Sequence, residues 1–229
     1  MMDLACPSRA PGRQDPKLPG VPVQRRSPHL KVAAVLGSGG ALGAGLLYRR
    51  LTTPFPYAPW ALDRELPSLT RARLLDVLAP RPGERLLEVG PGTGLFSLPV
   101  ARAVGPTGTL DIFDIQAEML EHTTRVATEQ GLSNVSATRG DARRLPYGDG
   151  AFDGAFLVTV LGEVPQWPSA LRELRRVLRP GGRLVVGEFL LDWHAVPLTL
   201  LRRRGAALGL ALEHRSGPPY SYLARLRAI

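Results

Sequence analysis

The sequence is poor in the residues that build disulfide frameworks and metal clusters. Cys6 is the only cysteine among 229 residues, which excludes an internal disulfide and suggests a reducing compartment. There are only four histidines, and no cluster of ligands forms around them, so we expect no metal site. The G-x-S-x-G nucleophile elbow of many hydrolases is also missing. These absences exclude a disulfide scaffold and disfavour a metalloenzyme or a serine hydrolase of that type.

Positive charge is concentrated near the N-terminus. The chain carries a formal net charge of +9, yet residues 1–50 hold eight Lys/Arg and only two acids. The remaining residues, 51–229, are nearly balanced, with 21 Arg and 18 acids. Basic tails more often reflect solubility or a nearby anionic surface than base recognition, so we expect no nucleic-acid partner.

The first 66 residues divide into three segments by composition. Residues 1–31 are rich in proline and arginine and cannot bury enough apolar surface to offset their ordering entropy, which predicts a disordered basic tail. Residues 32–50 contain a run from Val32 to Tyr48 without any charge. Residues 51–66 are punctuated by prolines and aromatic side chains, and we interpret them as a linker and lid.

Three interpretations of the uncharged run remain open. Its length is at the lower limit for a membrane span, and Gly39 and Gly43 would allow close helix packing in lipid. The sequence GSGGALG also imitates a phosphate-binding loop, although no βαβ unit follows it. The third interpretation is an apolar arm that packs on the domain. We treat the segment as a possible membrane anchor.

From residue 67 to residue 229, apolar strands alternate with helical patterns, as expected of a single domain. This alternation is typical of an α/β protein with a doubly wound, mostly parallel sheet of Rossmann-like type. The last two strands are joined by a short turn, which predicts an antiparallel edge strand in a seven-stranded sheet. The expected strands are 85–89, 109–115, 135–139, 151–160, 183–189, 210–215 and 220–226, and the expected helices are 66–78, 95–104, 117–130, 168–178 and 198–208.

A glycine-rich loop lies between the first strand and the following helix, in the sequence LLEVGPGTG. Gly90, Gly92 and Gly94 would allow a ligand to approach the backbone at a helix N-terminus. Glu88 would repel a pyrophosphate but attract an ammonium group. Asp114 ends the second strand, where a carboxylate can accept hydrogen bonds from both hydroxyls of a ribose. An adenosine that carries an amino acid and no phosphates, S-adenosylmethionine, fits these demands.

Four motifs in order resemble those of class I S-adenosylmethionine-dependent methyltransferases, of the type-11 group that includes ubiquinone and menaquinone biosynthesis enzymes. LLEVGPGTG resembles the first motif and DIQAEML, residues 114–120, the second. GDARRLPYGDGAFD, residues 140–153, resembles the third, and LRELRRVLRPGGRLVVGE, residues 171–188, the segment that follows. The resemblance covers about residues 66 to 226 and implies S-adenosylmethionine as the cofactor.

The resemblance also implies a role for each matching residue. The methionine part would be held by Glu88 and the glycine loop, the ribose by Asp114, and the adenine by the second and third motifs. The implied cofactor-binding residues are Glu88, Gly90, Gly92, Gly94, Asp114, Ile115, Met119, Asp141, Ala142, Val158 and Thr159, although Val158 could equally belong to the core and Asp141 could simply form a turn.

The catalytic base is not identified by the motifs. Many relatives carry a histidine pair after the fourth strand, where this chain has Gly162 and Glu163. Weak candidates for a base are Glu163, His194 and Tyr220, although a lone polar residue near a cleft is usually structural. Because the sulfonium methyl is already activated, a base is optional.

The sequence thus predicts a methyltransferase that acts on a small molecule, for which a lipid-like or quinone-like acceptor is suggested. The alternative is a non-catalytic S-adenosylmethionine-binding or membrane-anchored scaffold protein. A nicotinamide enzyme is disfavoured by Glu88 and by Leu95, which stands where a third glycine would be. A DNA adenine methyltransferase is disfavoured because GPPY, residues 217–220, lacks the required amide. We expect the domain in the cytoplasm, with the uncharged run as a possible attachment to the inner face of the membrane.

Overall fold

The computed structural model describes residues 65–229. The predictions for the tail at 1–31, the apolar segment at 32–50 and most of the linker at 51–66 therefore lie outside the described residues. Within residues 65–229, none of the helices combines the length and the apolar character that crossing a bilayer would require.

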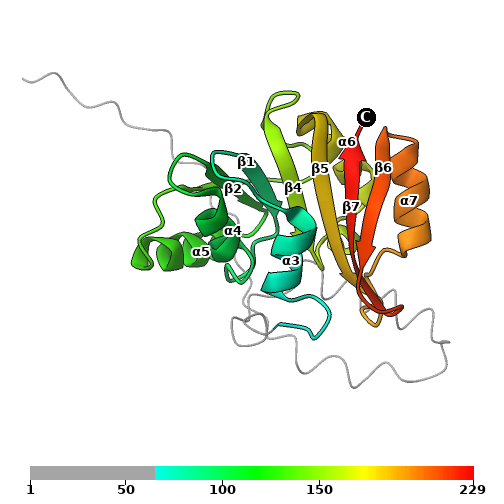
Figure 1. The fold of residues 1–229 in the computed structure, drawn as a ribbon, viewed down its shortest axis with the longest axis horizontal. Coiled ribbons are helices and arrows are strands. Elements are labelled where there is room, and N and C mark those ends of the chain that lie inside the picture. Colours follow the sequence, from blue (N-terminus) through cyan, green and yellow to red (C-terminus); the bar gives the residue numbers. More distant parts are fainter. Residues whose placement is uncertain (1–64) are drawn as a thin grey trace, which may run out of the picture. The chain divides into compact units, whose positions relative to one another are not determined.

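A seven-stranded sheet forms the centre of the domain, in the order β3-β2-β1-β4-β5-β7-β6 (Figure 1). The five strands from β3 to β5 are parallel, whereas β7 pairs antiparallel with both β5 and β6. The predicted fold class is thus confirmed, including the antiparallel edge. The strands are β1 (Arg85–Val89), β2 (Thr109–Asp114), β3 (Val135–Arg139), β4 (Phe152–Val158), β5 (Leu178–Phe189), β6 (Leu210–Ser216) and β7 (Ser221–Ala228).

Helices cover both faces of this sheet, because successive residues of a buried strand point to opposite sides. Leu86 packs in one apolar core with helices α3 and α4, and its neighbour Leu87 packs in the other core with α6. The helices are α3 (Arg71–Leu78), α4 (Ser97–Val104), α5 (Ala117–Glu129), α6 (Trp167–Val177) and α7 (Leu198–Ala206), with a short 3₁₀ turn, η3 (Leu161–Glu163).

Two element boundaries differ from the sequence prediction by five residues, and the others agree to within two residues. Helix α3 begins at Arg71 and not at Leu66, because the Thr70 side chain caps it by accepting a hydrogen bond from the Arg73 N–H at 3.2 Å. Strand β5 begins at residue 178 and not at 183, because Leu178 already pairs with Phe152 of β4 and the Pro-Gly-Gly segment forms an irregularity before the pairing resumes at Arg183.

The order of the strands reverses between β1 and β4. The connections from β1 and β4 therefore leave the sheet in opposite directions, and a crevice opens at the carboxyl ends of these strands. In open α/β sheets this is the usual position of a ligand site. All of the cofactor-binding residues predicted from the sequence lie in β1, β2 or β4 or in the segments that follow β1, β2, β3 and β4.

Candidate functional site

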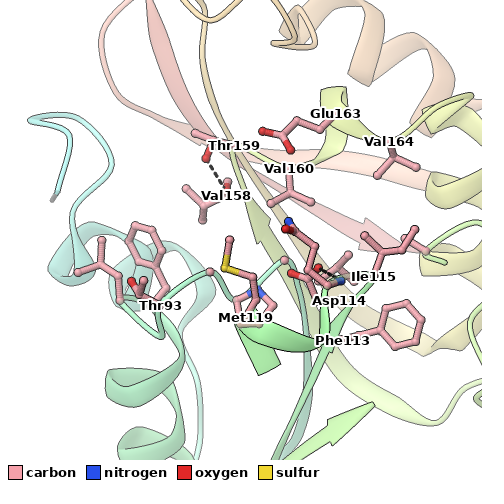
Figure 2. A pocket seen from close by; sticks show the side chains of 18 of the residues that line it. Thr93, Phe113, Asp114, Ile115, Met119, Val158, Thr159, Val160, Glu163 and Val164 are labelled. Atoms are coloured by element: carbon pink, nitrogen blue, oxygen red, sulfur yellow. Dashed lines mark hydrogen bonds between the residues drawn. The ribbon is translucent and has the colours of Figure 1, made fainter. Parts of the chain in front are cut away.

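A cavity of about 570 Å³ lies at the carboxyl ends of the parallel strands. This volume is within the range of small-molecule sites. Figure 2 shows side chains from several elements turned toward it. The lining includes Leu66, Leu69, Val89, Gly90, Pro91, Gly92, Thr93, Leu95, Phe96, Phe113, Asp114, Ile115, Gln116, Met119, Gly140, Asp141, Ala142, Arg143, Val158, Thr159, Val160, Glu163, Val164, Pro165, Phe189 and Asp192.

The glycine loop needs its glycines for two structural reasons. Gly90, Gly92 and Gly94 have φ values of +75°, +55° and +89°, a region that side chains disfavour. A Cβ atom added to Gly90 would also lie only 2.3 Å from a methyl carbon of Val160. The loop after β1 therefore packs directly against the end of β4. The small residues were expected from the sequence to serve a ligand alone, whereas contacts within the protein already require Gly90.

Glu88 is buried just before this loop, outside the lining of the cavity. Its side chain is 2% exposed, and the Oε2 atom has no hydrogen-bond partner among the described residues. Burial raises the pKa of Glu88 to about 8, a hydrogen bond with the Ser97 side chain opposes this increase, and the negative charge of Asp114 adds a smaller increase. The carboxyl group is thus mostly neutral at neutral pH, and a nearby cation would favour its ionised form.

A second buried polar atom beside the loop lacks a partner among residues 65–229. It is the hydroxyl oxygen of Thr93, which lines the cavity. Buried polar atoms are nearly always satisfied in native proteins. Two such atoms beside one loop, the Thr93 hydroxyl and the Glu88 carboxyl oxygen, therefore fit a polar ligand that supplies hydrogen-bond donors. Thr93 lies inside the quoted glycine motif but was not among the predicted binding residues.

Asp114 ends β2 and projects into the cavity beside Met119 (Figure 2). Its Oδ1 atom accepts a hydrogen bond from the Gln116 N–H at 2.8 Å. Burial raises the pKa of Asp114, and hydrogen bonds from backbone N–H groups oppose the increase. Ile115 lines the same region and is 52% exposed. These positions agree with a site for a ribose and a flat apolar ring.

Asp141 and Ala142 line the cavity after β3. The Asp141 Oδ1 atom accepts a hydrogen bond from the Arg143 N–H at 2.9 Å, and both carboxyl oxygens contact the Arg143 guanidinium group. This contact lowers the pKa of Asp141. Asp141 thus shapes a turn and also faces the cavity, and its assignment to an adenine amino group stays a prediction.

The end of β4 holds an unusual backbone conformation. Thr159 has a φ value of +57°, which is rare for a residue branched at Cβ. Its N–H donates to the Gly187 carbonyl at 2.8 Å, and its hydroxyl group donates to the Val158 carbonyl at 2.7 Å. Both Val158 and Thr159 line the cavity. Strain of this kind is often retained where a site needs it.

Only one of the three candidate bases lines the cavity. Glu163, in η3, is part of the lining and lies near Thr159 and Val160, on the side opposite Phe113 and Met119 (Figure 2). His194 is buried and Tyr220 is half exposed, and neither belongs to the lining.

The wall that carries Glu163 is otherwise mostly apolar, and the sequence analysis did not identify it. It contains Val160, Val164, Pro165 and Phe189, with Asp192 as a second carboxylate. No motif marks these residues, because they come together only when the segments after β4 and β5 pack side by side.

Glu188 anchors this wall from beneath. Its buried carboxyl group accepts hydrogen bonds from the backbone N–H groups of Gly162, in η3, and of Val196. The Tyr222 hydroxyl donates to the Val196 carbonyl at 2.6 Å. Burial raises the pKa of Glu188 to about 8, the charges of Asp192 and Glu163 add to the increase, and the two backbone hydrogen bonds oppose it. The two loops that form the wall are thereby tied to β5 and β7.

No group of three or more potential metal ligands occurs within residues 65–229. The polar side chains of the cavity are carboxylates, hydroxyls, the amide of Gln116 and the guanidinium group of Arg143, set in a largely apolar lining. Such a site can bind an organic ligand that has a polar end, a diol and an apolar ring.

Comparison with known proteins gives a family match over most of the described chain. The model of the ubiE/COQ5 methyltransferase family matches residues 65–194. The ubiquinone/menaquinone biosynthesis C-methyltransferase UbiE of Pseudomonas aeruginosa is 39% identical over 116 residues, which cover 50% of this chain and 45% of that protein. The nocamycin O-methyltransferase of Saccharothrix syringae is 39% identical over 112 residues, 49% of this chain and 40% of that one. The chain thus spans less than half the length of these relatives.

Solved structures share the fold at lower identity. A SAM-dependent methyltransferase from Aquifex aeolicus has a TM-score of 0.68 at 20% identity, covering 75% of this chain and 97% of that one. The [4+2]-cyclase SpnF has a TM-score of 0.61 at 22% identity, covering 69% of this chain and 78% of that one. Because a cyclase shares the architecture, the fold alone does not decide the reaction.

Replacing Thr159 by glycine tests whether the end of β4 is strained. Relief of the left-handed conformation should gain about 1–2 kcal/mol, and the greater freedom of glycine in the unfolded chain should cost about 0.5–1 kcal/mol. We therefore expect the free energy of unfolding to rise by about 0.5–1 kcal/mol in Thr159→Gly, measured by chemical denaturation. The control Thr109→Gly, at the start of β2, should lower it. A loss of stability in both variants would show that Thr159 is not strained.

Proposed function

The chain belongs to the ubiE/COQ5 methyltransferase family, and we propose that it transfers a methyl group to a small acceptor of lipid-like or quinone-like type. Family membership confirms the resemblance found in the sequence, and with it the class I methyltransferase assignment and S-adenosylmethionine as the cofactor. The buried polar atoms of Glu88 and Thr93 beside the cavity weigh most for this proposal in the structure, since they match a ligand ammonium group.

The residues around the cavity fit the parts of this cofactor. Bound S-adenosylmethionine supplies a methyl group on a positively charged sulfur, which makes the methyl group ready for transfer. We assign the amino-acid end to Glu88 and Thr93 and the ribose hydroxyls to Asp114. The adenine would lie against Ile115 and Met119, with Asp141 near its amino group.

The apolar wall opposite this region suits the acceptor. Val160, Val164 and Phe189 would pack against an apolar ring or chain and exclude water from the reacting atoms. Two relatives are named for ubiquinone/menaquinone biosynthesis and for O-methylation of nocamycin, so relatives methylate both carbon and oxygen. We infer an acceptor with an acidic hydroxyl group on an apolar body, in keeping with this wall.

Glu163 is our candidate for the group that contacts the acceptor. It lies in the lining between the end of β4 and the apolar wall, and its backbone is held in η3 by the Glu188 anchor. A carboxylate there can accept the hydrogen bond of an acceptor hydroxyl and take up its proton during transfer. Much of the catalysis would come from alignment of the two reactants by the two walls.

Replacement of Asp114 tests the cofactor site and the activity together. Asp114→Ala should weaken S-adenosylmethionine binding by about 1.5–3 kcal/mol, because the ribose hydroxyls lose a charged acceptor. Calorimetry measures this change, and transfer of radiolabelled methyl groups to quinone precursors should fall with it. Asp149→Ala, which changes an exposed carboxylate, should bind as the wild type does. Unchanged affinity in Asp114→Ala would refute the site. Binding without transfer to any quinone, lipid or phenol would favour a non-catalytic protein.

Glu163→Gln tests the acceptor side separately. Loss of a positioned base typically lowers the reaction rate about 10²–10⁴-fold. For an acceptor with an acidic hydroxyl group we expect a loss of rate near the lower end of this range. We expect kcat to fall about 100-fold while the affinity for S-adenosylmethionine, measured by calorimetry, stays within a factor of two or so. Glu121→Gln, on the exposed face of α5, is the control. A wild-type kcat in Glu163→Gln would remove this residue from the mechanism.

A further inference from the structure

The large apolar side chains that are exposed in residues 65–229 gather at one end of the domain. Six are exposed, and five of them follow β2, follow β5 or lie in the turn before β7. The sixth, Ile229, is the C-terminal residue. Figure 1 shows the loop after β5 and the β6–β7 turn at the same end of the sheet. We name these five residues the apolar rim: Ile115, Leu190, Leu191, Trp193 and Tyr220.

The apolar rim adjoins the mouth of the cavity. Ile115 belongs to both the rim and the lining of the cavity. On the other side, the Leu190 N–H donates to the Tyr220 carbonyl at 2.8 Å, and the Tyr220 ring meets the ring of Phe189, a lining residue, edge to face with 6.3 Å between ring centres. The exposed apolar surface is therefore continuous with the wall that we assign to the acceptor.

The composition of the rim suits the boundary between a bilayer and water. Single exposed apolar residues are common, but a gathering of them marks a binding surface. Leu191 is 71% exposed and Trp193 is 68% exposed. Tryptophan and tyrosine favour the level of the lipid headgroups because their rings are apolar and their tips are polar.

Arginines at the same end favour an anionic bilayer. Arg139 ends β3, Arg144 follows it, and Arg215 lies near the end of β6, and all three are exposed. Basic residues near a membrane surface are attracted to anionic lipids. The described part of the chain also begins near this end, since Leu66 lines the cavity.

We propose that the apolar rim docks on the surface of a bilayer that contains anionic lipids. Docking would bring the mouth of the cavity against the bilayer, so that a lipid-like acceptor could enter without crossing water. The direct entry of an acceptor from the bilayer rests on the proposed function, whereas docking on the bilayer does not require methyl transfer.

A fluorescent probe on the rim tests the docking directly. In the chain of 229 residues, Cys6→Ser removes the one cysteine of this sequence, and Leu191→Cys then carries the environment-sensitive dye NBD. With phosphatidylcholine vesicles that contain phosphatidylglycerol, we expect a blue shift and a severalfold increase in emission at position 191. The same dye at Ile229→Cys, also exposed, should respond little.

The other outcomes would overturn the proposal in distinguishable ways. If the chain sediments with vesicles while the dye at position 191 is unaffected, another segment binds the lipid. If the dye is already blue-shifted without vesicles, the rim is covered by the chain itself, or by a second copy when the shift grows with protein concentration.

A second variant separates docking from the proposed activity. Leu191→Ser with Trp193→Ser should reduce sedimentation with the same vesicles severalfold and leave the affinity for S-adenosylmethionine unchanged, which shows that the fold is intact. Unchanged sedimentation would contradict the docking. If the dye at position 191 responds to vesicles but the protein transfers no methyl group, the docking is supported and only the proposed function is rejected.

Discussion

The contact between the glycine loop and the end of β4 is the constraint on which the site depends. Gly90 approaches Val160 so closely that even one added carbon would clash. Strands β1 and β4 are neighbours at the reversal of the strand order, and their following segments diverge around the cavity. The loop that we assign to the cofactor and the wall that we assign to the acceptor thus share one packing contact. This contact can hold two reactants in register, which is the main demand of a transfer from an already activated donor.

Two buried carboxyl groups give the site its electrostatic character. Glu88 is buried next to the glycine loop and Glu188 is buried under the wall that carries Glu163, and burial raises the pKa of each to about 8. Their surroundings include further carboxylates, Asp114 beside the first and Asp192 beside the second, so ionisation of either group adds repulsion as well as desolvation. One oxygen of each group, Oε2 of Glu88 and Oε1 of Glu188, has no partner among the described residues, and Glu188 also accepts hydrogen bonds from the backbone N–H groups of Gly162 and Val196. Glu188 therefore ties two loops to the sheet, whereas we assign Glu88 to the ammonium group of the ligand.

The order of strands and helices could be predicted from the sequence because the pattern is strong. Buried parallel strands are short apolar runs, and glycine or proline marks most of the turns between them. The cofactor residues could be located because they lie within local motifs: Asp114, Met119 and Asp141 all line the cavity. The start of α3 was predicted too early because capping by Thr70 outweighs the helical spacing before it.

The acceptor wall could not be predicted, since it depends on contacts between distant segments. Val160 follows β4 and Phe189 ends β5, and both line the same cavity because β4 pairs with β5. The choice among Glu163, His194 and Tyr220 likewise needed the position of each side chain. The sequence could not show why residue 90 must be glycine, because the side chain nearest to it, Val160, lies seventy residues away in the chain.

Proton release on binding tests the central claim, that the loop and Glu88 receive the charged end of S-adenosylmethionine. Free Glu88 is mostly protonated at neutral pH, and a bound ammonium group would lower its pKa, so binding should release a proton and tighten as the pH rises toward 8. Calorimetry in buffers of different ionisation enthalpy should give close to one proton released per ligand, and almost none in Glu88→Gln. No release from the wild type, or equal release from the variant, would contradict the account.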